Sequence, residues 1–137
     1  MTIIGFTFTK MSIEKEGTIR GKISINNNVS IKDVVEVDLA LGKAKQKALK
    51  FTFEFTSKYE PKVAEILLRG ELLYLGDERK IKEITDKWKK DKKIPKDVTK
   101  VLLDHVLAKC NIQALILSKD INLPPPIPMP KVQIDTK

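Results

Sequence analysis

Apolar and polar residues alternate along most of the first 75 residues. In the stretch 3–13, the side chains that point one way are apolar, namely Ile4, Phe6 and Phe8. Those that point the other way are Thr7, Thr9 and Met11. Such alternation, rich in aromatic and β-branched residues, predicts a β-strand. The same pattern predicts further strands at 22–41, 49–56 and 63–75.

Short breaks separate these predicted strands. Residues Asn26–Asn28 interrupt the second predicted strand. Because Asn tolerates left-handed backbone geometry, this stretch is either one bent strand with a bulge or a hairpin of two strands. Residues 42–47 are expected to form a short basic loop, and residues 59–61 to break the third strand. Parallel strands need long crossover connections, so these short breaks predict an antiparallel sheet.

After Gly76 the apolar residues recur at helical spacing. Asp77 is a suitable N-cap for a helix at 78–90, whose apolar stripe is thin. Pro95 suits the first turn of a second helix at 96–119, which is apolar around more than half its girth. A helix so broadly apolar predicts a subunit interface as well as a core. The residues expected at that interface are Val101, Leu102, His105, Val106 and Cys110.

The end of the chain, residues 121–137, is rich in proline and is expected to run extended against the folded body. The chain of 137 residues is long enough for a real core, so we predict one α+β domain over 1–137: a four-stranded antiparallel sheet followed by two C-terminal helices.

Composition and charge narrow the setting. No apolar run approaches the roughly 20 residues that span a bilayer, and no signal peptide is evident, so we expect a cytoplasmic protein without membrane insertion. The net charge is +8, with 26 basic and 18 acidic residues interleaved. A lysine-rich, heat-adapted surface and a nucleic-acid partner both fit this balance, and the first is favoured.

Candidate catalytic chemistry is sparse. His105 and Cys110 are the sole histidine and cysteine, and five helical residues turn through about 500°, so their side chains diverge. No metal-ligand spacing, phosphate loop or serine elbow occurs in the sequence. We therefore expect a binding protein with no catalytic residues, no cofactor and no metal, in which Cys110 packs in the core.

The order of elements and two short stretches resemble the SecB-like chaperones. The opening strand, Phe6-Thr7-Phe8-Thr9-Lys10-Met11-Ser12-Ile13, is similar to the start of that family. So is the segment after the long helix, Ile121-Asn122-Leu123-Pro124-Pro125-Pro126-Ile127. The resemblance implies a SecB-like fold, a homotetramer or dimer, and an ATP-independent holdase that binds non-native polypeptide clients in apolar grooves.

The residues expected to contact clients are the apolar residues of the early strands and the tail: Phe6, Phe8, Ile13, Ile23, Ile25, Leu123, Ile127 and Met129. The basic charge disfavours the acidic docking face that a SecA-type motor requires. Export, general holdase activity and toxin–antitoxin control all stay open.

Two other functions are compatible with the residues. One is a nucleic-acid-binding module that uses Lys87–Lys93, a lysine cluster with Trp88 inside it, although a solvated helix end is the favoured reading. The other is an adaptor for one dedicated protein partner.

Overall fold

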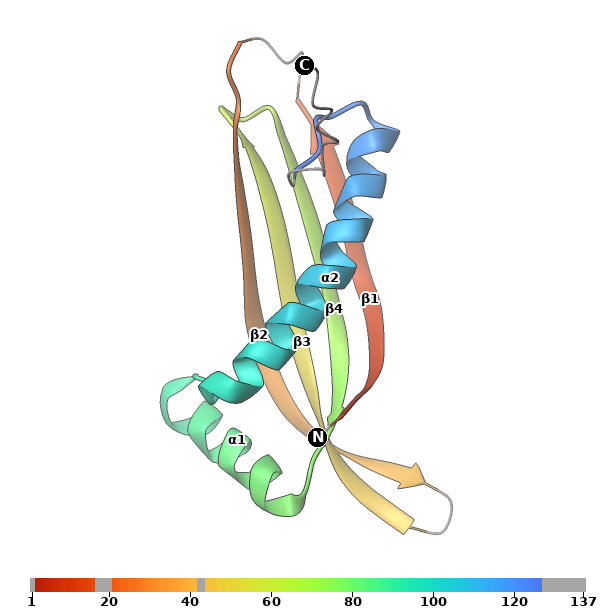
Figure 1. The fold of residues 1–137 in the computed structure, drawn as a ribbon, viewed down its shortest axis with the longest axis vertical. Coiled ribbons are helices and arrows are strands. Elements are labelled where there is room, and N and C mark those ends of the chain that lie inside the picture. Colours follow the sequence, from red (N-terminus) through yellow and green to blue (C-terminus); the bar gives the residue numbers. More distant parts are fainter. Residues whose placement is uncertain (1, 17–20, 42–43, 127–137) are drawn as a thin grey trace, which may run out of the picture.

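A computed structural model describes residues 2–16, 21–41 and 44–126 (Figure 1). It contains the four strands and two helices that the sequence predicts, in the predicted order. They are β1 (Thr2–Lys15), β2 (Ser24–Leu41), β3 (Ala44–Glu60), β4 (Ala64–Leu75), α1 (Glu78–Asp91) and α2 (Lys96–Asp120).

The four strands form one antiparallel sheet in the order β1-β4-β3-β2. The antiparallel prediction is confirmed. Strand β3 is longer than predicted, because its backbone pairing with β2 continues beyond the apolar pattern in both directions. Lys47, expected in a loop, pairs with Asp38, and Tyr59, expected in a break, pairs with Ile25.

The irregular positions of the sheet differ from those predicted. The asparagines 26–28 lie in regular register with residues 56–58, and β2 is one strand whose register shifts between Ile31 and Asp33. Strand β1 shifts register between Ile3 and Gly5, so the residue between them, Ile4, is a bulge. Ile4 is 42% exposed, and the prediction that it shares a face with Phe6 and Phe8 is wrong.

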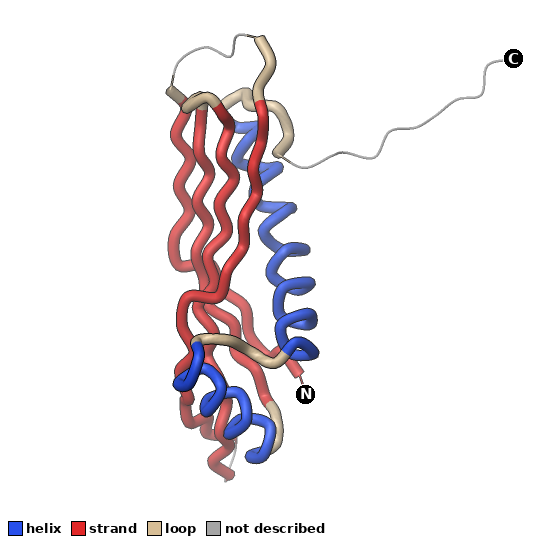
Figure 2. The backbone as a smooth tube through the Cα atoms, turned by 90° about the vertical axis from the view of Figure 1, so that its left-hand side faces the viewer, coloured by secondary structure: helices blue, strands red, loops and turns tan. Residues whose placement is uncertain are grey.

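Helix α2 crosses one face of the sheet diagonally, so the molecule has two layers (Figures 1 and 2). The core lies between these layers and consists mainly of the alternate residues of β3 and β4 that face α2. From α2 it receives Val98, Leu102, Val106, Cys110, Ala114 and Ser118. Positions four apart turn by about 40° around a helix at each step, which fits a diagonal path over a twisted sheet.

Gly70 lies in the middle of β4, where the aromatic residues of the neighbouring strands meet. Its pairing partners are Phe8 on β1 and Phe53 on β3. A Cβ at this position would lie 2.5 Å from Phe53 Cζ and even closer to the carbonyl oxygen of Thr7. The absence of a side chain therefore lets the Phe53 ring lie over the strand.

Helix α1 packs against β2 and β3, beyond the N-terminal end of α2 (Figure 1). Caps at its two ends stabilise it. The Asp77 carboxylate accepts a hydrogen bond from Lys80 N at 2.8 Å, as predicted for the N-cap. Lys80 Nζ lies 2.8 Å from Asp97 Oδ2 of α2 and links the two helices. This hydrogen bond raises the pKa of Lys80 and lowers the pKa of Asp97.

Candidate polypeptide-binding surface

The first part of the candidate surface is an aromatic row on β1, the edge strand beside α2. Phe6 stacks on Phe53 with ring centroids 5.1 Å apart, and Phe8 meets Phe6 edge to face at 5.1 Å. Phe6 also lies 5.6 Å from the His105 ring of α2. Phe6 and Phe8 are partly buried, so each ring anchors in the core and still presents an edge to solvent.

The rest of the β1 surface extends this row. Ile13 pairs with Ile66 and is partly buried. Met11 pairs with Leu68 on the same face and is 45% exposed. The sequence reading assigned Met11 to the opposite face, because it could not detect the second register shift of β1, between Phe8 and Lys10. Met11 is therefore a candidate contact that the prediction missed.

The second part of the surface is at the other edge of the sheet, where Ile23, just before β2, and Ile25, near its start, are partly buried. The segment 121–126 crosses from the end of α2 toward this edge. Tyr59 Oη donates to the carbonyl oxygen of Pro124 at 2.6 Å, and Asn27 Nδ2 donates to that of Pro126 at 2.9 Å. Burial raises the pKa of Tyr59 to about 12.

The segment 121–126 is anchored in the core. Leu123 is 6% exposed, so it acts as an anchor of this segment, and as the structure stands a client could reach little of it. Ile127 and Met129 lie outside the described residues. The remaining predicted contacts fall into two groups, Phe6, Phe8 and Ile13 at one edge and Ile23 and Ile25 at the other, with α2 and residues 121–126 between them.

The predicted interface residues of α2 fall into a buried group and an exposed group. Leu102, Val106 and Cys110 are 0% exposed and pack on the sheet of their own chain, so they are not available to a partner. Burial raises the pKa of Cys110 to about 12, in keeping with its predicted place in the core. Val101 is 47% exposed, and His105 is partly buried against β1.

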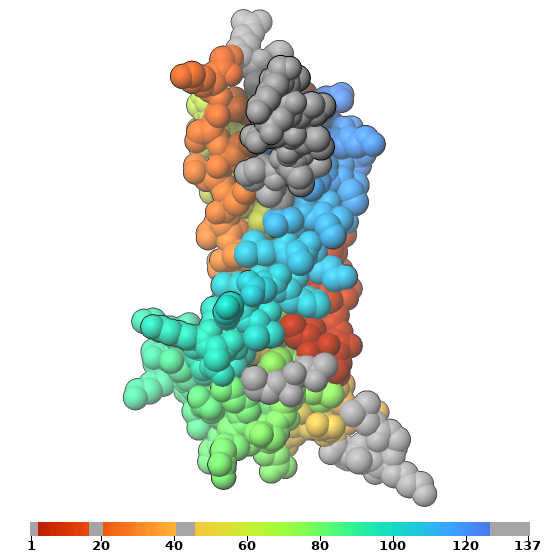
Figure 3. Space-filling model, viewed as in Figure 1, coloured from red at the N-terminus to blue at the C-terminus, as the bar shows by residue number. Residues whose placement is uncertain are grey.

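A row of apolar residues starts at Val101 and runs along the outward side of α2. We call it the outer stripe. Its members are Val101, Ala108, Ile112 and Ile116. Ile112 is 60% exposed and Ile116 is 48% exposed. Helix α2 lies on the surface along most of its length in the view of Figure 3. The sequence showed that the helix is apolar on several sides, but the crossing angle decides which residues face outward.

The lysine cluster 87–93 does not form one basic track. Successive residues of α1 are turned by about 100°, so the lysines point in several directions around the helix. Lys92 Nζ lies 5.4 Å from the centre of the Trp88 ring, and Trp88 is partly buried. This arrangement offers less to a phosphate backbone than the sequence suggested.

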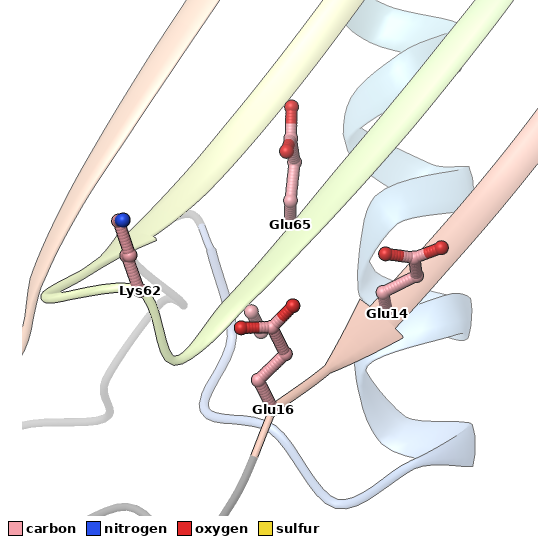
Figure 4. A pocket seen from close by; sticks show the side chains of 5 residues that line it. Glu14, Glu16, Lys62 and Glu65 are labelled. Carbon is pink, nitrogen blue, oxygen red and sulfur yellow. The ribbon is translucent and has the colours of Figure 1, made fainter.

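An acidic hollow lies where β1 ends and β4 begins (Figure 4). Glu14 and Glu65 are cross-strand neighbours, and Glu16 and Lys62 line the same hollow. All four side chains are exposed, and the carboxylates stand apart. Within residues 2–16, 21–41 and 44–126 no group of His, Cys, Asp or Glu is arranged to hold a metal ion.

Helix α2 is long and apolar enough to cross a membrane by length and composition alone. The core helix of a soluble protein passes the same test. In this structure the six buried residues of α2 face the sheet, and Lys100, Asp104 and Lys109 are exposed along it. Packing on the sheet therefore accounts for one side of α2 and leaves the outer stripe uncovered.

This arrangement, a four-stranded antiparallel sheet followed by a long helix across one face, is the SecB-like chaperone fold, as the sequence resemblance predicted. The structure is similar to that of the Mycobacterium tuberculosis Rv1957 SecB-like chaperone in complex with a ChAD peptide from the Rv1956 HigA1 antitoxin. The TM-score is 0.59, the identity is 10%, and the match covers 98% of this chain and 92% of that chain. No protein-family model and no curated protein sequence matches this chain.

Proposed function

We propose that this protein is an ATP-independent holdase that keeps non-native polypeptides soluble by covering their apolar segments. The observation that carries the proposal is the β1 surface, where Phe6, Phe8 and Met11 keep part of their apolar area in solvent at an open sheet edge. An extended client segment can bind there through apolar contacts, and adaptable Met side chains suit variable sequences.

The fold supports a polypeptide as the ligand class. A chaperone with this fold is in complex with a peptide from an antitoxin. That complex also favours a second candidate, an adaptor for one dedicated partner, because its peptide comes from one named protein. Isolation of the protein from native lysate separates the two: a holdase retains many clients in small amounts, and an adaptor retains one partner in a fixed ratio.

Suppression of aggregation tests the holdase. A thermally unfolded model enzyme is followed by light scattering with increasing amounts of the chain and without ATP. We expect suppression at substoichiometric to equimolar chain and a weaker effect for Met11→Ser, which removes exposed apolar area without touching the core. Thr7→Ser, an exposed change on the other face of β1, is the matched control. Aggregation that continues at a several-fold excess of the chain would contradict the proposal.

We also propose that the protein is a homo-oligomer, a dimer or a tetramer, assembled through the outer stripe of α2. The stripe places three half-exposed aliphatic side chains, Val101, Ile112 and Ile116, on one helix. Ile112 and Ile116 lie one helical turn apart with the exposed Ala108 one turn before them, and grouped exposed apolar residues of this kind mark interaction sites. The proposed setting is the cytoplasm, which fractionation of the source cells would test.

A further inference from the structure

A shallow, open groove lies between the end of α1, the start of α2 and β2, apart from the surfaces described above. Its volume is about 500 Å³. The residues that line it are Ile31, Trp88, Lys92, Lys93, Ile94, Lys96, Thr99 and Lys100. We call it the α1–α2 groove. Its composition is unusual, because nearly all of its lining is either apolar or lysine.

The apolar part of the groove comes from three separate elements. Ile31 stands at the register shift of β2, Trp88 lies in the last turns of α1, and Ile94 lies in the connection between the helices. All three are partly buried. The connection is fixed in place by the left-handed Lys92, whose N–H donates to the carbonyl oxygen of Trp88 at 2.9 Å, and by the buried Pro95. The apolar lining is therefore preformed.

The charged part of the groove is a rim of Lys92, Lys93, Lys96 and Lys100, which are all exposed. Within the part of the chain that the structure describes, none of these four ammonium groups lies within 4.0 Å of a carboxylate. By contrast, Lys80 pairs with both Asp97 and Glu83. The rim therefore makes no ion pair within the described residues, although Asp91, Asp97 and Asp104 lie near it in the sequence.

Helix stability does not explain all of this charge. Lys92 and Lys93 follow the C-terminus of α1, where a positive charge is favourable. Lys96 begins α2, at the end of a helix where a positive charge is unfavourable, and Lys100 stands one turn further on. An anionic partner would account for the placement of these two lysines.

We propose that the α1–α2 groove docks a polypeptide segment in which apolar or aromatic side chains are flanked by Asp or Glu. The apolar side chain would lie against Ile31, Trp88 and Ile94, and the flanking carboxylates would pair with the lysine rim. This inference deepens the proposed function, on which it rests, because it adds a class of client segment and a second contact site. It also gives the net charge of +8 a role in the selection of clients.

The lining favours an acidic peptide over a nucleic acid. Two of the three apolar residues are isoleucines, which offer no stacking surface to a base. Trp88 is the one aromatic residue of the lining, so the groove gives a single platform on which a base could stack, whereas successive bases of a strand need several. Single-stranded nucleic acid is accordingly the rival outcome of the test.

The chain carries its own reporter, because Trp88 is its sole tryptophan. Synthetic peptides without tryptophan, in which Phe and Leu alternate with Glu, are titrated against the full chain while Trp88 fluorescence is recorded. A matched peptide with Gln in place of every Glu is the control. Anisotropy of the labelled peptides provides a second readout.

We expect the acidic peptide to shift Trp88 emission and to bind at least about fivefold more tightly than the Gln peptide at low salt, with the difference shrinking as salt screens the lysines. The pair Lys96→Gln/Lys100→Gln should weaken the acidic peptide by about three- to tenfold. The pair Lys82→Gln/Lys109→Gln removes the same charge from exposed positions outside the groove and should have a much smaller effect.

Three results would overturn the inference: equal affinity for both peptides, an equal loss in the two lysine pairs, or a Trp88 response to oligothymidylate stronger than that to the acidic peptide. Failure here is distinct from failure of the holdase. If Lys96→Gln/Lys100→Gln still suppresses aggregation while no peptide discriminates by charge, the groove proposal falls and the proposed function stands. If aggregation is not suppressed by any variant, the holdase falls.

Discussion

Replacement of Ile112 and Ile116 by serine should weaken self-association and leave the fold intact. The two residues are 60% and 48% exposed, so about half of each side chain is still open to burial in an interface. Full burial of an Ile side chain contributes about 1.5–3 kcal/mol. The remaining half is therefore worth about 1 kcal/mol for each residue, or about 2 kcal/mol for each copy of the chain. Both copies contribute the stripe to a symmetric interface, so one interface loses about 4 kcal/mol.

A loss of about 4 kcal/mol raises the dissociation constant of one interface by about 1,000-fold. Helix α2 itself should tolerate the change. Ile and Ser have similar helix propensities, and neither position contributes to the core, which α2 meets through residues such as Cys110 and Ala114. The circular dichroism of the variant should match that of the parent chain.

Sedimentation velocity over a wide range of concentration measures this effect. The parent chain should sediment as a species larger than its 15.6 kDa monomer, and the variant should need an about 1,000-fold higher concentration to assemble to the same extent. Val35→Ser is the matched control, because Val35 is 40% exposed and pairs with Lys50 on the face of the sheet away from α2. Removal of apolar area at Val35 should leave the assembly unchanged.

Two outcomes would refute the reasoning. A parent chain that stays monomeric at every concentration would leave the outer stripe without a partner of its own kind. A variant with the same assembly as the parent would place the interface elsewhere, and the free edge of β1 would then be the next surface to test.

Three further predictions concern the packing. Gly70→Ala should lower the free energy of unfolding by about 2–3 kcal/mol in urea titrations, because the new methyl group would lie 2.5 Å from Phe53 Cζ; a loss under about 0.5 kcal/mol would contradict this. Tyr59→Phe should cost about 1 kcal/mol at pH 7 through the lost hydrogen bond to Pro124. Burial raises the pKa of Tyr59 from 10.0 to about 12, so above pH 10 the unfolded chain loses the phenol proton more readily than the folded one. The stability difference between the parent chain and Tyr59→Phe should therefore shrink as the pH rises from 10 to 12. Cys110 is 0% exposed with its pKa raised to about 12, so a thiol reagent should modify it only as fast as the chain opens, and rapid labelling of the native protein would argue against the buried site.

The alternation that predicts strands at 49–56 and 63–75 coincides with the buried side chains of β3 and β4. Phe51, Phe53 and Phe55 are at most 1% exposed, as are Ile66 and Leu68 of the facing strand. These strands lie in the middle of the sheet, where every second side chain is buried. The prediction was reliable because it depends on local geometry alone.

The errors occurred where a position depends on a distant partner. The bulge at Ile4 exists because β1 must match β4, which is some 70 residues further along the chain. The burial of Leu123 depends on hydrogen bonds that Tyr59 and Asn27 donate to its segment. Neither dependence has a local signal in the sequence.

The interface residues of α2 show the same limit. A count of apolar residues detects that the helix is apolar on more than one side. It does not give the crossing angle over the sheet, and that angle directs Leu102 inward and Ile112 outward.

The strand order has a consequence for folding during synthesis on the ribosome. Strand β1 leaves the ribosome before the other three strands, yet in the described sheet it pairs with β4, which ends at Leu75. Until the hairpin of β3 and β4 has emerged, Phe6, Phe8 and Met11 have no strand to pair with, and long-range pairing of this kind is slow. During its own synthesis the chain therefore displays an extended apolar segment of the kind it is proposed to hold, and each nascent copy meets the description of a client for the copies already folded.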